Sequence, residues 1–365
     1  MRKLGIALLL CTAAIPAVPA GAQSPYERFS LNTTAEIDVF HGDNVSSRPQ
    51  IIIDIVATAR LGNGWQAFFR PWFRQARPTA PGLTAPPWDA QIYQASVRYE
   101  RSAPVSTRVD LGFMPSPVGL GIFDVNPKQN PVIAAHSSYF TPMLPFDTGS
   151  ARVPAIASTY PLAAVAMAST SRWDARVAVT NSAPVRISVA GVTANPHSTP
   201  VFEAGAGVTP VIGLRLGASF AHGAYLTASE FPPSLPQVDR SVTLLGFEGE
   251  YAFRYTKLTT EVVHDTFATI GGDVDATTWF VEGTQSIAPR WSVSGRHEGT
   301  TSPVVATGIF FAAQPTMLAN EATLGFRINR ELLLKGSYYT RRPYGRVGDW
   351  DHQVALQLVW DRRWR

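Results

Sequence analysis

The chain has 365 residues and a formal net charge of +4, with 16% charged against 45% hydrophobic residues. This balance, without a basic tail, excludes the electrostatic pattern of a nucleic-acid-binding protein. The single cysteine, Cys11, lies near the N-terminus, so the remaining chain carries no disulfide framework. After the N-terminal segment, no run approaches the roughly 18 consecutive apolar residues of a transmembrane helix, and we expect no such helix.

The N-terminal segment has the pattern of a secretory signal peptide. Two basic residues precede the apolar run LGIALLLCTAAIPAV, and the small-residue sequence PAGA follows it and ends at Ala22. We expect cleavage after Ala22, so that residues 1–22 are removed and residues 23–365 form one domain. Loss of the two basic residues changes the totals of 31 basic and 27 acidic side chains to 29 and 27.

Beyond the signal peptide, apolar and polar residues alternate in segments of about ten residues. Each segment predicts a strand with one apolar face, and a tilted strand of this length crosses a bilayer. About 16 strands are predicted in chain order: 29–40, 50–61, 65–75, 90–101, 107–114, 162–170, 173–181, 201–208, 213–225, 241–255, 256–267, 277–286, 291–299, 319–328, 332–340 and 352–360.

The connections between these segments alternate in length. Tight turns such as 61–64, 170–172 and 288–290 separate longer polar or proline-rich connections, of which the longest spans about 115–161. Short periplasmic turns and long extracellular loops are typical of bacterial outer-membrane barrels. The fold expected is therefore all-β, a transmembrane antiparallel β-barrel.

Aromatic residues lie beside the predicted short turns. An apolar core of a soluble β protein is the alternative interpretation, but core aromatics belong in the middle of strands. Aromatics at strand ends predict a girdle at the membrane interface, formed by Trp65, Tyr99, Trp173, Tyr255, Trp291 and Phe326.

The charged faces of the strands are expected to point into a water-filled lumen, because a charge at mid-membrane on the lipid face costs about 2–4 kcal/mol. Neighbouring strands then form a basic wall and an opposing acidic wall that orient solutes in a transverse field. The alternative is that each charge is only solvated lumen lining. The basic wall comprises Arg60, Arg70, Arg74 and Arg98, and the acidic wall Glu248, Glu250, Glu261 and Asp265.

The signal peptide, the strand number, the alternating connections and the aromatic last strand QVALQLVW resemble the bacterial outer-membrane porins over nearly the whole mature chain. DLGFMPSPVGLG, a long loop and then RVPAIASTY are similar to the phosphate-selective porins of the O/P type. The final residues DRRWR depart from the usual terminal aromatic, so Trp360 or Trp364 must serve instead. The resemblance implies an outer-membrane location, contact with outer-membrane lipid, insertion by the barrel-assembly machinery and a homotrimer.

The resemblance also implies that the third extracellular loop folds into the barrel and narrows it. Here that loop is the segment of about 115–161, which contains few charges. A surface cap or an oligomer contact is the alternative role for this segment. The loop charges that could act at a constriction are Asp124, Lys128, Asp147 and Arg152.

The expected function is passive diffusion of small hydrophilic solutes, with a preference for anions set by the basic wall. A substrate-specific channel for sugars or carboxylates is one alternative, and a closed structural barrel is another. Aromatic side chains that could guide solutes in either kind of channel are Phe68, Trp72, Tyr139 and Phe140.

Motifs for an enzyme are missing from the sequence. It contains no G-x-S-x-G, H-E-x-x-H or phosphate-binding loop. His264 and Asp265 are adjacent on a predicted strand and point to opposite faces, with His264 toward lipid. The loop IGGDVDA lacks the ligands of a calcium site. We expect no enzymatic activity, no metal and no cofactor.

Overall fold

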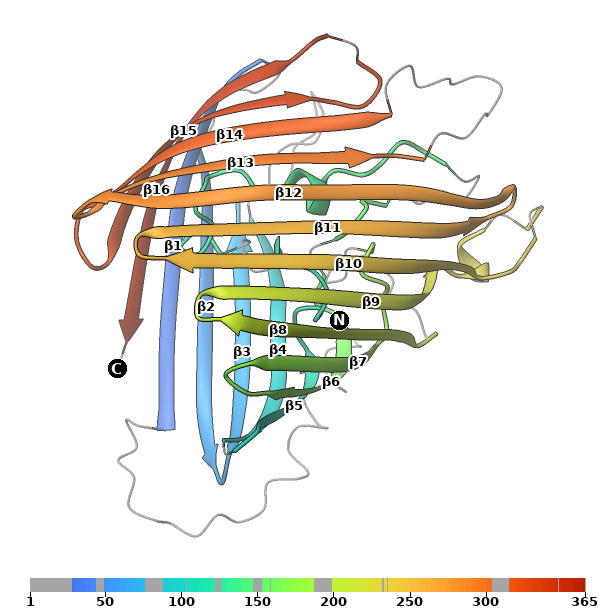
Figure 1. Cartoon of the computed structure of the whole chain (residues 1–365), viewed down its shortest axis with the longest axis horizontal. Helices are drawn as coiled ribbons and strands as arrows, with labels where there is room; N and C mark the ends of the chain where they lie inside the picture. The colour runs from blue at the N-terminus through green and yellow to red at the C-terminus, as the bar shows by residue number, and fades with distance from the viewer. Residues whose placement is uncertain are drawn as a thin grey trace.

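The computed structural model describes residues 28–43, 49–75, 88–102, 104–121, 126–146, 153–157, 159–186, 199–231, 233–234, 236–303, 315–346 and 348–364. The expected signal peptide, residues 1–22, lies outside these ranges. The described residues form one closed antiparallel barrel in which each strand pairs with its neighbours in sequence (Figure 1). Pairing of the first strand with the last closes the barrel, with Ala35 opposite Trp360.

The strands are β1 Phe29–Gly42, β2 Pro49–Gly62, β3 Trp65–Arg74, β4 Asp89–Arg101, β5 Ser106–Phe113, β6 Leu162–Ser169, β7 Trp173–Thr180, β8 Val201–Val211, β9 Leu214–Leu226, β10 Arg240–Phe253, β11 Thr256–Thr269, β12 Gly272–Ala288, β13 Trp291–Thr301, β14 Thr316–Arg327, β15 Leu332–Arg342 and β16 Asp351–Trp364. In the part of the chain that the structure describes, two short helices, α3 Ser137–Phe140 and η2 Ala228–Glu230, lie in connections. Within the described ranges, no helix has both the length and the hydrophobicity to span a membrane.

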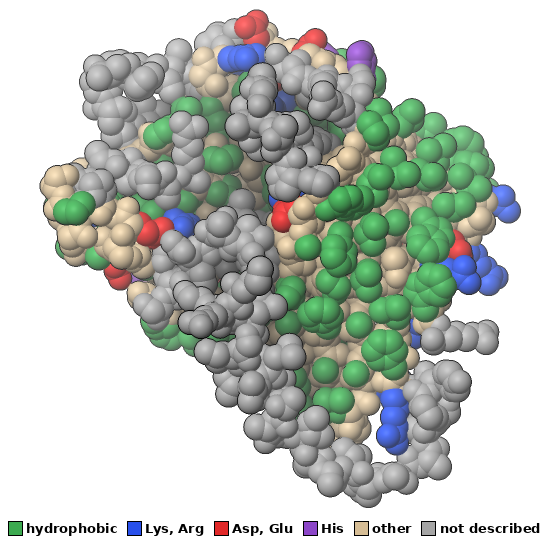
Figure 2. Space-filling model, turned by 180° about the vertical axis from the view of Figure 1, so that it is seen from behind, with side chains coloured by type: hydrophobic (Ala, Val, Ile, Leu, Met, Phe, Trp, Pro, Cys, Tyr) green, Lys and Arg blue, Asp and Glu red, His purple; other side chains and the backbone are tan. Residues whose placement is uncertain are grey.

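Alternation of side chains decides which face of each strand is apolar. On β10, Leu245 and Phe247 are exposed on the outer surface, whereas Leu244 and Glu248 are buried on the inner surface. The same pattern recurs around the barrel, and Figure 2 shows a broad field of apolar side chains on one outer face. An outer face of this kind is stable only against an apolar medium, because large exposed apolar patches are rare on soluble proteins.

The predicted all-β barrel is confirmed, and most strand ends differ from the predicted ones by only one to three residues. The segment IGGDVDA is an exception, because β12 already begins at Gly272 and only two residues join it to β11. The Thr266 hydroxyl donates a hydrogen bond to Asp275 at 2.9 Å, so the aspartate is satisfied within the sheet. The last strand also continues to Trp364, whose indole N–H donates to the Thr33 hydroxyl at 3.0 Å.

Glycines on β8 make room for an ionic cluster on the inner surface. A Cβ atom at Gly205 would lie 2.7 Å from Nε of Arg176, and one at Gly207 would lie 2.6 Å from a carboxylate oxygen of Asp174. Arg215 binds Asp174 through Nε at 2.8 Å. The sequence AGAG at 204–207 therefore leaves space for these long side chains on the face of β8 that points into the lumen.

Candidate functional site

The long connection between β5 and β6 folds into the space that the strands enclose (Figure 1). We call its described residues between 114 and 161 the inner loop. Its first anchor is Ser116, whose hydroxyl donates to Glu203 on β8 at 2.9 Å. Thr180 on β7 donates to the same carboxylate at 3.0 Å. The start of the inner loop is thereby fixed to the wall beside β7 and β8.

Glu261 on β11 holds the next part of the inner loop. This carboxylate is 2% exposed and accepts the backbone N–H of Leu120. It also accepts the Tyr139 hydroxyl at 2.8 Å, and that hydroxyl in turn accepts the Gly121 N–H at 3.1 Å. One wall carboxylate therefore joins two segments of the inner loop that are distant in sequence.

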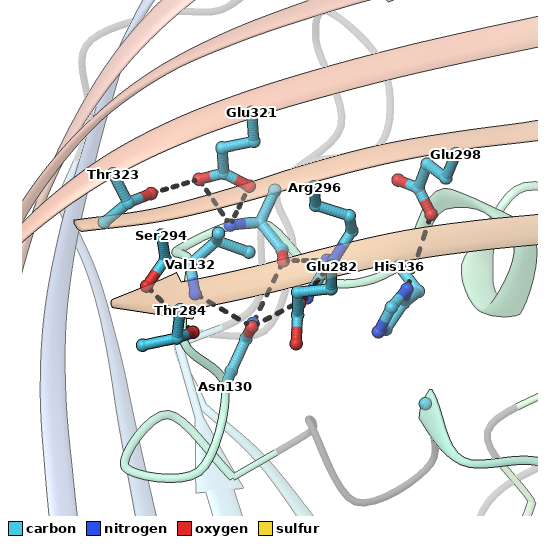
Figure 3. Close-up of polar contacts among 12 residues, drawn as sticks. Asn130, Val132, His136, Glu282, Thr284, Ser294, Arg296, Glu298, Glu321 and Thr323 are labelled. Carbon is cyan, nitrogen blue, oxygen red and sulfur yellow. Dashed lines mark hydrogen bonds and ion pairs between the residues drawn. The ribbon is translucent and has the colours of Figure 1, made fainter. Parts of the chain in front are cut away.

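Two further wall carboxylates bind the backbone around residue 135 (Figure 3). Glu321 on β14 accepts the N–H groups of Ile133 at 2.9 Å and Ala134 at 3.1 Å. Glu298 on β13 accepts the Ser137 N–H at 3.0 Å, and His136 lies 3.5 Å from it. Hydrogen bonds from backbone amides to a buried carboxylate are charge-assisted, so each is stronger than a neutral one.

Two buried cations of the wall bind the carbonyl side of the same segment. Lys335 on β15 is 3% exposed, and its Nζ donates to the carbonyls of Pro127 and Asn130 at 2.7 Å and of Val132 at 3.1 Å. Arg296 on β13 donates to the Ala134 carbonyl at 2.9 Å and to Oδ1 of Asn130 at 2.8 Å. All three Lys335 protons are thus used by the inner loop.

The inner loop reaches the opposite side of the barrel at residues 126–128. Asn126 donates through Nδ2 to Asp54 on β2 at 3.3 Å. Lys128 forms an ion pair with Asp361 on β16. Because these contacts lie on β2 and β16 while Glu261 lies on β11, the inner loop crosses the lumen rather than capping its mouth.

Apolar packing fills the lumen on the β8–β12 side of the inner loop. Val118, Ile156 and Tyr160 pack in one buried cluster with Leu244 and Val263 of the wall. A second buried cluster joins inner-loop and wall residues, including Met143, Phe146, Tyr225, Val242 and Phe267. Among the described residues, packed side chains occupy this side of the barrel, and the first of the two clusters continues to Trp72 on β3 and Tyr93 on β4.

A cavity of about 430 Å³ lies between the inner loop and strands β1–β4, β15 and β16. Its charged lining consists of Glu36 and Asp38 on β1, Arg74 on β3 and Arg341 on β15. Because β1 stands between β3 and β15 in the barrel, the two carboxylates are flanked by a guanidinium on each side. The facing inner-loop surface includes Pro127, Asn130, Ile133, Ala134, Ala135 and Phe140.

The predicted basic wall lies on β2, β3 and β4, and most of it is paired. Arg70 binds Asp54 at 2.7 Å with both partners buried, and Arg74 binds Asp89 at 3.3 Å. Arg60 is exposed near the end of β2. The fourth member, Arg98, shares one carboxylate with another arginine: Asp110 lies 2.7 Å from Arg98 and 2.5 Å from Arg108.

The predicted acidic wall lies behind the inner loop and lines none of the 430 Å³ cavity. Glu248 pairs with Arg176 and with Arg215, and Glu250 lies 3.6 Å from Lys257. Glu261 is an anchor of the inner loop, as described above. Asp265 is fully buried opposite Leu244, and neither carboxylate oxygen has a hydrogen-bond partner among the described residues.

The remaining predicted positions are divided between described and undescribed residues. Among the loop charges, Lys128 binds Asp361, whereas Asp124, Asp147 and Arg152 lie outside the described residues.

The aromatic residues of the predicted girdle all lie at the short-turn ends of strands or in a turn. Two cross-strand ring pairs are formed: Trp65 with Tyr99 at 5.2 Å and Trp291 with Phe326 at 4.5 Å. Trp173 and Tyr255 are exposed at such ends.

Sequence reasoning missed the acidic residues of the open cavity, Glu36 and Asp38. The alternation in AEIDVF, with Ile37 and Val39 on the outer face, places both carboxylates inside by the rule used elsewhere. It also missed Lys335 and Arg296 as loop anchors, because their partners are backbone carbonyls. Within the described ranges, no group of three His, Cys, Asp or Glu side chains could hold a metal ion.

No family model matches the chain, and no curated protein matches its sequence. Among solved structures, it is similar to OmpF of Salmonella typhi in complex with daunomycin, with TM-score 0.60 and 10% identity over 92% of this chain and 97% of that chain. It is also similar to OmpT, an outer membrane protein of Vibrio cholerae, with TM-score 0.59 and 9% identity over 92% and 97%. An anion-selective porin from Comamonas acidovorans matches with TM-score 0.55 and 9% identity over 92% and 99%.

At these low identities the comparisons establish a shared fold, the closed barrel of bacterial outer-membrane porins. They give no support to the narrower similarity with phosphate-selective porins, because no family model matches.

Proposed function

We propose that the protein is an outer-membrane porin through which small hydrophilic solutes diffuse passively. The observation that carries this proposal is the cavity of about 430 Å³ between the inner loop and the β1–β4, β15 and β16 wall. Ionic, amide and aromatic side chains line it, and buried ions require such hydrated or paired surroundings. A volume of this size accommodates a small solute with its water, as small-molecule sites of about 300–1,000 Å³ do.

The proposal includes the route by which the protein reaches its membrane. The signal peptide of residues 1–22 exports the chain, and the barrel-assembly machinery inserts it into the outer membrane. The apolar outer face and the aromatic strand ends support contact with lipid. A homotrimer is the assembly expected from the resemblance to porins. Diffusion through the lumen involves no chemical step, so the protein is proposed to have no enzymatic activity and no cofactor.

A preference for anions is a narrower part of the proposal. Asp110 is shared by Arg98 and Arg108, so one positive charge remains on this part of the wall after pairing. Within the cavity itself, Arg74 and Arg341 face Glu36 and Asp38, and each guanidinium also has an aspartate beside it, Asp89 for Arg74 and Asp351 for Arg341. The preference is therefore expected to be small, and to arise near the short turn between β4 and β5 rather than in the cavity.

A substrate-specific channel for sugars is the second candidate function. Trp72 and Phe140 both line the cavity. Phe140 is 40% exposed and could stack on a sugar ring, whereas Arg74 lies 5.2 Å from the centre of the Trp72 ring; Gln50, Gln353 and Gln357 could bind hydroxyl groups. The other two aromatic candidates do not line the cavity. Tyr139 is buried against Glu261, and the Phe68 ring is covered by Arg98 at 4.5 Å.

Recording currents from the purified protein in a planar lipid bilayer tests the proposal. Discrete steps that scale with salt concentration are expected, with a reversal potential slightly shifted toward that of the anion. Current that is blocked by a neutral sugar at low concentration would favour the specific channel. A folded barrel without current steps would contradict both functions and favour a closed structural barrel.

A further inference from the structure

The outer surface carries histidines at a level where the apolar field ends. His222 on β9, His264 on β11, His297 on β13 and His352 on β16 are all exposed on the outer face. We call these four residues the outer histidine row. His264 lies about eight residues beyond the short-turn end of β11, and a tilted strand rises about 2.5 Å per residue along the membrane normal. The row is thus about 20 Å above the aromatic strand ends, near the upper edge of an apolar band about 25 Å tall.

Strand register places His222, His297 and His352 in polar rows, and His264 pairs with Thr277 in a neighbouring row. His222 pairs with Thr243, which pairs with Thr266, which pairs with Asp275. On the adjoining strands β13 to β16, His297 pairs with Asn320, then Thr340, then His352. Two polar rows of hydroxyl, amide, imidazole and carboxylate groups therefore lie on the outer surface, one from β9 to β12 and one from β13 to β16, and Val281 is the β12 partner of His297. Side chains of this kind are costly in hydrocarbon and stable against lipid headgroups.

Each imidazole is attached to a neighbouring strand through the same atom. Nδ1 lies 2.9 Å from the Thr243 hydroxyl in His222 and 3.1 Å from the Thr277 hydroxyl in His264. Nδ1 of His297 lies 2.7 Å from Oδ1 of Asn320, and Nδ1 of His352 lies 2.7 Å from the Tyr338 hydroxyl. These contacts fix the rings and leave Nε2 as the second polar atom of each.

The Nε2 atoms have the chemistry of a phosphate ligand. Oδ1 of Asn320 is an acceptor, so Nδ1 of His297 carries the proton and Nε2 is available to gain one. Within the described ranges, no hydrogen bond reaches Nε2 of His222, His297 or His352, whereas Nε2 of His264 lies 3.7 Å from Asp275. A protonated imidazole donates from both nitrogens and carries a positive charge.

We propose that the outer histidine row binds phosphate headgroups of anionic lipids at the outer edge of the membrane. This inference rests on the proposed membrane location and concerns the outer surface rather than the lumen. Attraction between a protonated imidazole and a phosphate monoester is charge-assisted and holds the barrel at a defined depth. Deprotonation leaves only neutral hydrogen bonds, so the attachment is stronger in acid.

The charged groups around the row set the contribution of each member. Asp275 stands beside His264, Asp43 accepts the backbone N–H of His352 at 3.0 Å, and His41 on β1 is exposed opposite Val354, two residues from His352. These carboxylates repel a phosphate and offset the charge of the neighbouring imidazole. The cross-strand partners of His222 and His297 are uncharged. His222 and His297 therefore contribute most of the attraction.

Thermal unfolding in defined vesicles tests the inference. The protein is inserted into phosphatidylcholine vesicles with or without about one fifth phosphatidic acid, whose headgroup is a phosphate monoester. The midpoint of unfolding is followed by heat-modifiable gel mobility at about pH 5.5 and about pH 8. For the wild type we expect phosphatidic acid to raise the midpoint by a few degrees more at the lower pH.

Variants separate the histidines from the rest of the surface. The double variant His222→Gln with His297→Gln keeps a cross-strand hydrogen-bonding group and is expected to lose most of the acid-dependent shift. His264→Gln is the matched control, because Asp275 already offsets that imidazole, and it is expected to retain most of the shift. An equal shift in the wild type and the double variant would overturn the proposal.

Two further measurements distinguish lipid binding from binding of free anions, and the histidine row from the porin function. Inorganic phosphate added to phosphatidylcholine vesicles must not reproduce the shift, since an equal effect would mean that the row binds free anions instead of lipid. Single-channel recording on the same preparations reports the pore separately. Normal conductance with no lipid-dependent shift would refute the histidine row alone, whereas a folded protein without conductance would refute the porin function alone.

Discussion

Lys335→Met is the substitution that most directly tests how the inner loop is held. Methionine keeps most of the length of the lysine side chain and removes its charge. The variant thus loses three hydrogen bonds from Nζ, to the carbonyls of Pro127, Asn130 and Val132. A hydrogen bond from a charged donor contributes about 1.5–3 kcal/mol.

The net loss is smaller than the sum of three such bonds, because water in the adjoining cavity hydrates the released carbonyls. We expect about 2 kcal/mol of lost attachment between the inner loop and β15. Since 1.4 kcal/mol corresponds to a tenfold change in an equilibrium constant, the detached state should become about 30-fold more populated. A detached segment moves within the cavity that residues 127–135 border, so it interrupts the current.

Single-channel recording measures this effect as the fraction of time spent in brief closures. Lys257→Met is the matched control, because Lys257 is 61% exposed and contacts Glu250 on a neighbouring strand rather than the inner loop. The control should leave closures unchanged. If Lys335→Met folds to a heat-modifiable barrel and its closures match those of the wild type, then Lys335 does not restrain the inner loop.

Three further outcomes are expected. Changing both Arg74 and Arg341 to Gln leaves the cavity acidic. The reversal potential in a salt gradient should therefore move toward the equilibrium potential of the cation. An unchanged reversal potential would show that this cavity does not select between ions. Asp265→Val should raise the thermal midpoint, because it removes a buried carboxylate that has no hydrogen bonds among the described residues. Burying such a group costs the folded state about 1–3 kcal/mol. A lowered midpoint would reveal a favourable contact of Asp265. Gly207→Ala should lower the midpoint because its Cβ would lie 2.6 Å from a carboxylate of β7, whereas Gly295→Ala, with no atom nearer than 3.6 Å, should not.

The barrel could be predicted from the sequence because the patterns that specify its strands and turns involve residues close together in the chain. A period of two residues identifies a strand and its apolar face, and the length of each connection identifies the side of the membrane. This reasoning fails where polar residues continue a strand, as at Asp273 and Asp275 of β12. The pattern there resembles a loop, but cross-strand partners such as Thr266 satisfy the polar groups and the sheet extends.

The alternation of side chains along each strand was not enough to predict the ion pairs within the wall. Arg70 could be placed in the lumen from its own strand, but its pairing with Asp54 depends on how β2 and β3 are aligned. A change in register by two residues keeps every side chain on its face and changes every partner. The strength of the predicted basic wall was therefore overestimated by counting arginines without their aspartates.

The attachment of the inner loop follows a different logic from side-chain pairing. Glu321 and Glu298 accept backbone N–H groups, and Lys335 donates to backbone carbonyls. The wall thus supplies the charges and the inner loop supplies its main chain, which accounts for how few charged side chains that long segment contains. Recognition of this kind is insensitive to the loop side chains and sensitive to the wall residues. It follows that Ile133→Ala should increase the fraction of time spent in brief channel closures far less than Glu321→Gln, although both residues belong to the same contact.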